Sequence, residues 1–442
     1  MKRPLRIAAL ALMLLGAASA QDVRSLGMGG LTLPGPAATG RNPAYAAYDA
    51  RRFGGGGFTL PLGLVNLALR PSISPLYYFR DPSVFRNHFD LLAFYDQLTH
   101  LDEFVINPPA SPREIVFHVS ADGVTVTDGD GNPFDLNRFS AQTPPPSGSL
   151  PPPLLELNLP SGVPGLRLAV GAFLQSGGFG LTPDDALVRD LASGSLQPNT
   201  TYHLTATGTV KGGITSTLGY AAPLPALPGF DGRVYLGGQI QAFYGMLYVD
   251  TTVTGQTTTD GSGNPGPLGY VTDMFYVVPG NGQGYGAQLD FGVVLDYEAG
   301  SYGLGVKNLV GLQRWNGHRM LTDASGSVVS DTAQNVSEGG FRPSIFANAA
   351  YLQPLEGAAG DLLLGADLGY APGAPSGHLG VEYRLAALRL RGGLGYEQGF
   401  KLGLGAGLEF SGLRTDLALT SHTAPFTGQV VYGVAASLGL AF

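Results

Sequence analysis

Ten charged residues in the second half of the chain are spaced so that they can form ion pairs. They are Asp290, Lys307, Glu382, Arg384, Arg389, Arg391, Lys401, Glu409, Arg414 and Asp416. Each lies in a segment where apolar residues alternate with small or charged ones, so in a strand the charges share one face. Short turns would place Glu382 opposite Arg391 and Glu409 opposite Arg414, with Asp290 diagonal to Lys307. This spacing predicts cross-strand ion pairs, which either fix the register of a packed lumen or form a polar constriction.

Patterns for catalysis are lacking. The seven histidines, at positions 88, 100, 118, 203, 318, 378 and 422, are scattered with no pair at ligand spacing. No serine lies in a G-x-S-x-G elbow, and the glycines of 54–57 are not followed by the Lys-Ser/Thr of a phosphate loop. A calcium loop starting at Asp128 would need Gly and Glu where the chain has Pro133 and Phe139. We therefore expect no enzymatic activity, no cofactor and no metal.

The elements that carry the charges are short segments with two different faces. In the last one, one face holds Tyr432, Val434, Ala436, Leu438, Leu440 and Phe442, and the other holds mostly small residues. Segments 379–385, 388–397, 400–410 and 413–420 repeat the rule, separated by tight Gly-rich turns. A soluble antiparallel sheet also alternates, but here no helix follows that would cover the apolar faces. The pattern is typical of a transmembrane β-barrel with lipid outside and charges in the lumen.

Further strands extend this pattern towards the N-terminus. We expect them at 58–69, 166–175, 202–220, 233–248, 284–298, 301–309, 344–352 and 361–370. With the five C-terminal segments the count comes to about fourteen, a normal number for a bacterial barrel. The predicted fold is all-β: an antiparallel transmembrane barrel over 53–442, with 250–270 and 321–342 as polar outer loops.

Residues 71–165 interrupt the barrel pattern. Apolar residues at helical spacing predict an amphipathic helix over about 84–105, after a start signal at Asp81-Pro82-Ser83. A small hairpin is expected over 115–126 and an extended proline-rich linker over 144–153. We interpret 71–165 as an insertion, with an α/β character, in the barrel.

The N-terminus has the form of a secretory signal. Lys2, Arg3 and Arg6 precede an apolar run, and Ala18-Ser19-Ala20 is an A-x-A cleavage site, so 1–20 is expected to be a signal peptide cut near Ala20-Gln21. Its removal leaves 22 basic and 33 acidic residues, a net charge of −11, which argues against nucleic acid as a partner. The chain has no cysteine, so disulfides and thiolate sites are excluded.

Three stretches carry a resemblance to a known family. The first is Leu26-Gly27-Met28-Gly29-Gly30 followed by Asn42-Pro43-Ala44; the second is 284–292 followed by 303–309; the third is Gly380-Val381-Glu382-Tyr383 followed by 388–392. Together they resemble the FadL-like outer-membrane β-barrels, and within them most closely the TraF-like and PorV-like branch.

The resemblance implies a location and a function. Residues 21–52 would form a hatch inside the barrel, carried by Leu26–Gly30 and Asn42–Ala44, and the barrel would pass small hydrophobic molecules across the outer membrane. The alternative is a non-transporting envelope barrel that serves as a platform for a secretion, conjugation or surface-layer complex. Expected partners are outer-membrane lipid, a hydrophobic ligand, an envelope protein, and the barrel-assembly machinery through the C-terminal Phe442.

Overall fold

The computed structural model describes the N-terminal segment 22–48 and nearly all of 155–440. Between them it describes residues 53, 58–62, 100, 103–107, 115–120, 123–128, 150 and 153, and within 155–440 it leaves out 160, 227, 268, 341–342, 356–359, 372–373, 398 and 425–428. The predicted signal peptide, Phe442, most of the predicted helix at 84–105 and most of the proline-rich linker lie outside the described residues.

One antiparallel sheet forms most of the described chain. Its seventeen strands are β1 (Phe58–Pro61), β2 (Phe104–Val105), β5 (Leu155–Leu159), β6 (Leu166–Pro183), β7 (Thr201–Pro223), β8 (Arg233–Thr258), β9 (Gly269–Val277), β10 (Gln283–Asp296), β11 (Gly300–Thr322), β12 (Val328–Gly340), β13 (Ser344–Pro354), β14 (Asp361–Ala371), β15 (Ala374–Leu385), β16 (Leu388–Glu397), β17 (Phe400–Phe410), β18 (Leu413–Thr423) and β19 (Val430–Leu440). A strand is present at each predicted position, although of the strand predicted over 58–69 only Phe58–Pro61 lies within the described residues.

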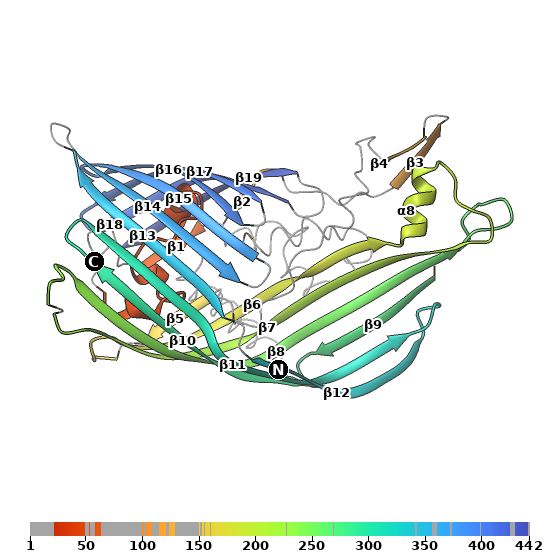
Figure 1. Ribbon diagram of the computed structural model, residues 1–442, viewed down its shortest axis with the longest axis horizontal. Coiled ribbons are helices and arrows are strands. Elements are labelled where there is room, and N and C mark those ends of the chain that lie inside the picture. The colour runs from red at the N-terminus through yellow and green to blue at the C-terminus, as the bar shows by residue number, and fades with distance from the viewer. Residues whose placement is uncertain are drawn as a thin grey trace.

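The sheet curls around the N-terminal segment. Each strand from β13 to β19 pairs with the next, and β5, β6, β7, β8, β10, β11 and β13 pair in that order. Both β1 and β2 pair with the second edge of β19, so segments more than 300 residues apart lie side by side. Figure 1 shows β13–β19 and β6–β11 on opposite sides of the N-terminal segment, which is drawn in red.

The outer face of the sheet is apolar, as the alternation predicted. Leu379, Leu404 and Phe400 are 62%, 62% and 78% exposed, whereas the small or charged residues between such positions are buried. On β19, Tyr432 and Leu438 face outward, and Ala435 faces inward. A sheet with an exposed apolar outer face and a polar inner face is stable when lipid covers the outside. The fold is an antiparallel transmembrane β-barrel.

Several strands are much longer than a membrane requires. A tilted strand crosses a bilayer in about 10 residues, whereas β7, β8 and β11 have 23, 26 and 23 residues. Beyond the barrel wall, the end of β7 pairs with β8, and the ends of β8 and β11 pair with β9 and β12, to form a sheet that we call the extension (Figure 1). The prediction that 250–270 and 321–342 are loops was therefore wrong for most of these residues, because β8 continues to Thr258 and β12 occupies Val328–Gly340.

Smaller elements complete the described chain. Helix α8 (Asp185–Ala192) follows β6 and lies near the outer ends of β7 and β8, and the predicted hairpin is present as β3 (Ile115–Ser120) and β4 (Gly123–Asp128). The predicted helix over 84–105 does not reach its expected end, because Phe104–Val105 is strand β2, held by pairing with β19. Among the residues that the structure describes, no helix is both long and apolar enough to cross a membrane.

The N-terminal segment contains three short helical elements. They are α2 (Val23–Gly27), the 3-10 helix η1 (Pro36–Ala38) and the 3-10 helix η2 (Pro43–Ala47). Asp22 caps α2 by accepting from the Arg24 amide, and Asn42 caps η2 by accepting from the Ala44 amide. Gly29 and Gly30 take φ values of 72° and 93°, which a residue with a side chain rarely adopts, so the chain can turn sharply after α2.

Candidate functional site

The N-terminal segment is joined to the barrel wall by a buried ion pair. Arg24 Nε and Nη2 each donate to one carboxylate oxygen of Glu382 at 2.8 Å, and Arg24 Nη1 donates to the Phe53 carbonyl at 2.5 Å. Arg24 is 5% exposed and Glu382 is 1% exposed. Because a bidentate pair fixes orientation as well as distance, this contact sets how α2 sits against β15.

Glu382 is also the centre of a network of predicted lumen charges. It accepts from Arg391 Nε at 2.6 Å and from Arg384 Nε at 2.8 Å. Arg391 Nη1 donates to Asp416 at 2.6 Å, and the other oxygen of Asp416 accepts from Arg414 Nε at 2.6 Å. Glu382 lies opposite Arg391 in register, as predicted. Five of the ten charges thus form one connected network under α2.

The predicted pair of Glu409 and Arg414 is present in register but not as an ion pair. The two residues lie opposite each other on β17 and β18. Arg414 points towards Asp416 and lies 3.7 Å from Asp22, whereas the side chain of Glu409 is 41% exposed and lies 3.7 Å from Arg389. The buried carboxylate of Asp416 attracts Arg414 more strongly than the exposed Glu409 does, because solvent screens the latter, and the half-buried Asp22 adds to this attraction.

Lys401 belongs to a second cluster, which meets the turn after α2. His378 lies 2.6 Å from Asp367 and 3.3 Å from Glu397, and Lys401 lies 2.5 Å from Glu397. Asp367 also accepts from the Thr32 amide at 2.6 Å. The cluster therefore holds a second point of the N-terminal segment to β14–β17.

Asp290 and Lys307 lie near each other at a bulge between β10 and β11, as predicted. The register shifts there, with Leu289 opposite Val310 and Phe291 opposite Val306. Asp290 accepts from the amide of Asn308 at 2.9 Å and from Gln239 at 2.8 Å, and Lys307 Nζ donates to the Leu150 carbonyl at 2.9 Å. Lys307 and Gln288, which accepts from the Leu150 amide at 2.8 Å, therefore hold a residue of the predicted insertion on the inner wall.

Inward-facing glycines form the surface on which the N-terminal segment lies. At ten of them an added Cβ would meet an atom of this segment: Gly237, Gly292, Gly303, Gly305, Gly365, Gly380, Gly393, Gly395, Gly403 and Gly405, which we call the glycine bed. At Gly393 the Cβ would collide with the Met28 carbonyl, and at Gly403 with the Leu26 carbonyl. The backbone of the segment can approach the wall this closely because these strands lack side chains there.

The residues of the Asn-Pro-Ala motif are held on the opposite wall. Asn42 Nδ2 donates to the Val293 carbonyl at 2.9 Å, and Asn42 and Ala44 are fully buried. Nearby, Tyr45 donates to Asn348 at 2.7 Å and Tyr48 donates to Asp296 at 3.1 Å. The two motifs singled out in the sequence, 26–30 and 42–44, thus contact different sides of the barrel, and the segment spans the lumen between them.

Where the wall continues into the extension, the sheet carries an aromatic cluster. Phe173, Phe243, Tyr248, Phe275 and Trp315 pack together with Leu150 and Val277, all buried. Phe243 and Tyr248 lie with ring centroids 5.4 Å and 5.0 Å from Trp315, and Lys211 Nζ lies 4.7 Å from the Tyr248 ring. The five aromatic side chains come from β6, β8, β9 and β11.

Sequence reasoning missed several residues of this site. Asp22, Arg24, Asp367 and His378 take part in the contacts above, but none belongs to a motif or was assigned a partner. Arg24 had one available signal: it is a lone cation two residues before the Leu26–Gly30 motif, in a segment expected inside a barrel. An isolated cation in that position needs a carboxylate.

Comparisons with known proteins give loose structural similarity only. No family model matches the chain, and no curated protein matches it. The Pseudomonas putida toluene transporter TodX has a TM-score of 0.42 and 13% identity over 96% of this chain and 99% of that one. The monoaromatic hydrocarbon channel CymD scores 0.28 at 11% identity over 63% and 88%, and the β domain of the Bordetella autotransporter BrkA scores 0.25 at 13% over 62% and 99%. Similarity at this level assigns neither a family nor a ligand.

Proposed function

We propose that this protein is a FadL-like outer-membrane channel for small hydrophobic molecules, with residues 21–52 as a hatch in the lumen. The observation that carries the proposal is the position of 22–48, which lie on the glycine bed and are joined to the wall by Arg24 and Asn42. A segment that crosses the lumen on specific contacts closes the channel, and a change in those contacts opens it.

The anchoring contacts are of a kind that suits a movable hatch. Buried ion pairs contribute little net stability, because desolvating the charges offsets most of their attraction, but they define one geometry. Water can replace the partners of Arg24 when the segment moves, whereas an apolar anchor would have to be exposed. The Arg24–Glu382 pair therefore favours one position of the hatch without locking it there.

The aromatic cluster indicates the class of molecule that passes. A channel for ions needs polar side chains along its path, whereas here the buried rings of Phe173, Phe243 and Trp315 form an apolar cluster on the inner face of the sheet, between which an apolar molecule would insert. Small apolar compounds, aromatic ones among them, would gain from contact with these rings.

A disulfide that locks the hatch tests the proposal. The chain has no cysteine, and a Cβ added at Gly27 would lie 3.6 Å from the Ala418 Cβ, a separation that a disulfide spans. In cells that express Gly27→Cys/Ala418→Cys, oxidation should stop uptake of a fluorescent apolar probe such as N-phenylnaphthylamine, and reductant should restore it. Each single variant is the control. Equal uptake in the locked and reduced states would exclude a moving hatch.

The extension favours a second candidate function, an envelope platform. At about 3.3 Å per residue, the 26 residues of β8 reach about 85 Å, far more than the membrane needs. Longer connections of outer-membrane barrels are usually extracellular, so the extension is expected to project from the cell, where it offers an edge for protein contacts. If removal of the extension abolishes a cross-linked envelope complex while uptake of the probe persists, the platform function is supported as an additional one. Loss of uptake alone would speak for the channel.

A further inference from the structure

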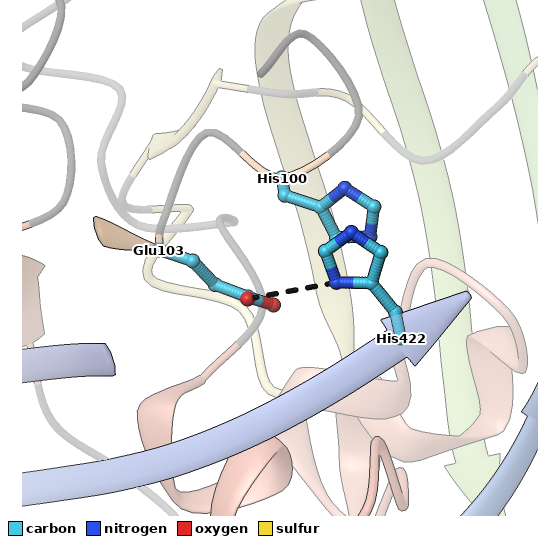
Figure 2. A group of neighbouring side chains, drawn as sticks. All are labelled: His100, Glu103 and His422. Atoms are coloured by element: carbon cyan, nitrogen blue, oxygen red, sulfur yellow. Dashed lines mark ion pairs between the residues drawn. The ribbon is translucent and has the colours of Figure 1, made fainter. Parts of the chain in front are cut away.

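At the end of β18, a histidine meets two ligand-type residues from a distant part of the chain. His422 lies on β18, and His100 and Glu103 both lie before β2, with Glu103 directly preceding it (Figure 2). One ring nitrogen of each histidine and a carboxylate oxygen of Glu103 all lie within 4.8 Å of one another. The two imidazole rings stack with centroids 3.5 Å apart and planes 10° apart.

We propose that His100, Glu103 and His422 bind one divalent transition-metal ion of the zinc class. Two imidazoles and a carboxylate are a common protein ligand set for zinc, with the fourth position left to water. Ligands about 2.1 Å from a tetrahedral ion are about 3.4 Å apart, so an ion would draw the three ligand atoms together from separations of up to 4.8 Å. It would also turn the stacked rings out of their parallel arrangement, because the lone pair of an imidazole nitrogen lies in the plane of its ring. The chemistry of nitrogen and oxygen donors also fits Co²⁺, which serves as a spectroscopic probe of the site.

The burial of Glu103 and His422, with His100 half-buried beside them, supports a built site. Glu103 and His422 are 2% and 4% exposed, and His422 Nδ1 lies 4.0 Å from the Glu103 carboxylate. A carboxylate out of contact with water is stabilised by nearby positive charge, which a divalent ion supplies. Because Gly433 has no side chain, the Glu103 carboxylate can lie against its backbone. A Cβ at position 433 would collide with Glu103 Oε2.

The backbone around the cluster holds the three ligands in place without an ion. The Ile106 amide donates to the Tyr432 carbonyl at 2.8 Å, and Asn107 donates to Val430 and accepts from the Tyr432 amide. Val105 packs against Ala424 and Val431 beneath the site. The ion would therefore link the predicted insertion 71–165 to the β18–β19 hairpin. It would lie at the end of β18 that is farther from the turn at 411–412, which joins β17 to β18.

Metal binding by the purified full-length protein in detergent tests the proposal. After treatment with EDTA and dialysis, we expect one Co²⁺ per chain with visible absorption bands of a tetrahedral site, displaced by Zn²⁺. His422→Ala, Glu103→Gln and Gly433→Ala should each weaken binding at least tenfold. The control is His318→Ala, which removes a histidine beside Asp331 on the extension and should bind like the wild type. Binding that is absent, or that is unchanged in the three site variants, overturns the proposal.

A second measurement does not depend on folding of the variants. Diethyl pyrocarbonate modifies accessible histidine nitrogens that carry no metal, and mass spectrometry of peptides locates the modified residues. Zn²⁺ should lower the modification of the half-buried His100 in the wild-type protein and leave that of His318 unchanged. Equal modification of His100 with and without Zn²⁺ would contradict the site.

Discussion

Arg24 and Glu382, 358 positions apart, form two parallel hydrogen bonds of 2.8 Å inside the barrel. One residue belongs to the segment that crosses the lumen and the other to the wall. Glu382 also pairs with Arg384 and Arg391, so a single carboxylate balances three guanidinium groups. The position of the N-terminal segment therefore depends on one acidic residue of β15.

Replacing this acid should destabilise the protein strongly. Glu382→Gln keeps the shape but leaves the guanidinium groups of Arg24, Arg384 and Arg391 without their shared counter-charge. Breaking a buried ion pair from one side costs about 3–5 kcal/mol. The change can be followed by urea unfolding with the fluorescence of the only tryptophan, Trp315. As a control, Glu409→Gln removes an exposed partner of Arg389 and should cost less than about 1 kcal/mol. Similar costs for the two variants would refute the central role of Glu382.

A side chain in the glycine bed should displace the N-terminal segment. In Gly393→Ala the new methyl group collides with the Met28 carbonyl, so the segment must lift and expose Arg24 and Arg41 to trypsin. The adjacent Gly392→Ala is the matched control, because its Cβ meets only Leu404, at 3.8 Å. We expect cleavage at least tenfold faster in Gly393→Ala than in Gly392→Ala. Equal rates would mean that the segment does not lie on this surface in membranes.

A charge swap between Glu409 and Arg414 should fail to restore stability. The register alone predicts that Arg414→Glu partly rescues Glu409→Arg. In the structure, Arg414 instead pairs with Asp416 and lies near Asp22, so Arg414→Glu places a third carboxylate beside two others. We expect Arg414→Glu alone to cost several times more than Glu409→Arg, and the double variant to be no more stable than Arg414→Glu. Heat-modifiable migration on gels with detergent reports the folded fraction, and a rescued double variant would show that the two side chains do pair.

Trp315 should report the entry of an apolar ligand into the aromatic cluster. Phe243 packs against it, with centroids 5.4 Å apart, whereas the next residue, Tyr244, is 50% exposed on the lipid face. Naphthalene or toluene should change the emission of Trp315 in a saturable way. Phe243→Ala should raise the apparent dissociation constant about tenfold, since lost aromatic contact costs about 1 kcal/mol or more. Tyr244→Ala should leave it unchanged. An identical response from both variants would place the ligand outside the cluster.

The sequence by itself determined the barrel strands, their inner and outer faces and the register of the C-terminal hairpins. These features are local: side chains alternate with period two, and a turn such as Ser411–Gly412, with φ values of 48° and 83°, fixes which residues lie opposite each other. The pairing of Glu382 with Arg391 followed from this alone. Polar strands such as β12 were not predicted from the sequence, because their residues do not alternate between apolar and polar and so lack the pattern that indicates a strand.

Only the tertiary structure decided which distant side chains meet. Arg24 approaches Glu382, and His422 approaches His100 and Glu103, because the sheet curls and brings both β1 and β2 to the free edge of β19. Likewise, Arg414 pairs with Asp416 and lies near Asp22, and it does not pair with Glu409 opposite it. Burial strengthens the attraction of Asp416, whereas solvent weakens that of Glu409. Register is a property of neighbouring strands, whereas partner choice depends on burial and on the path of the whole chain.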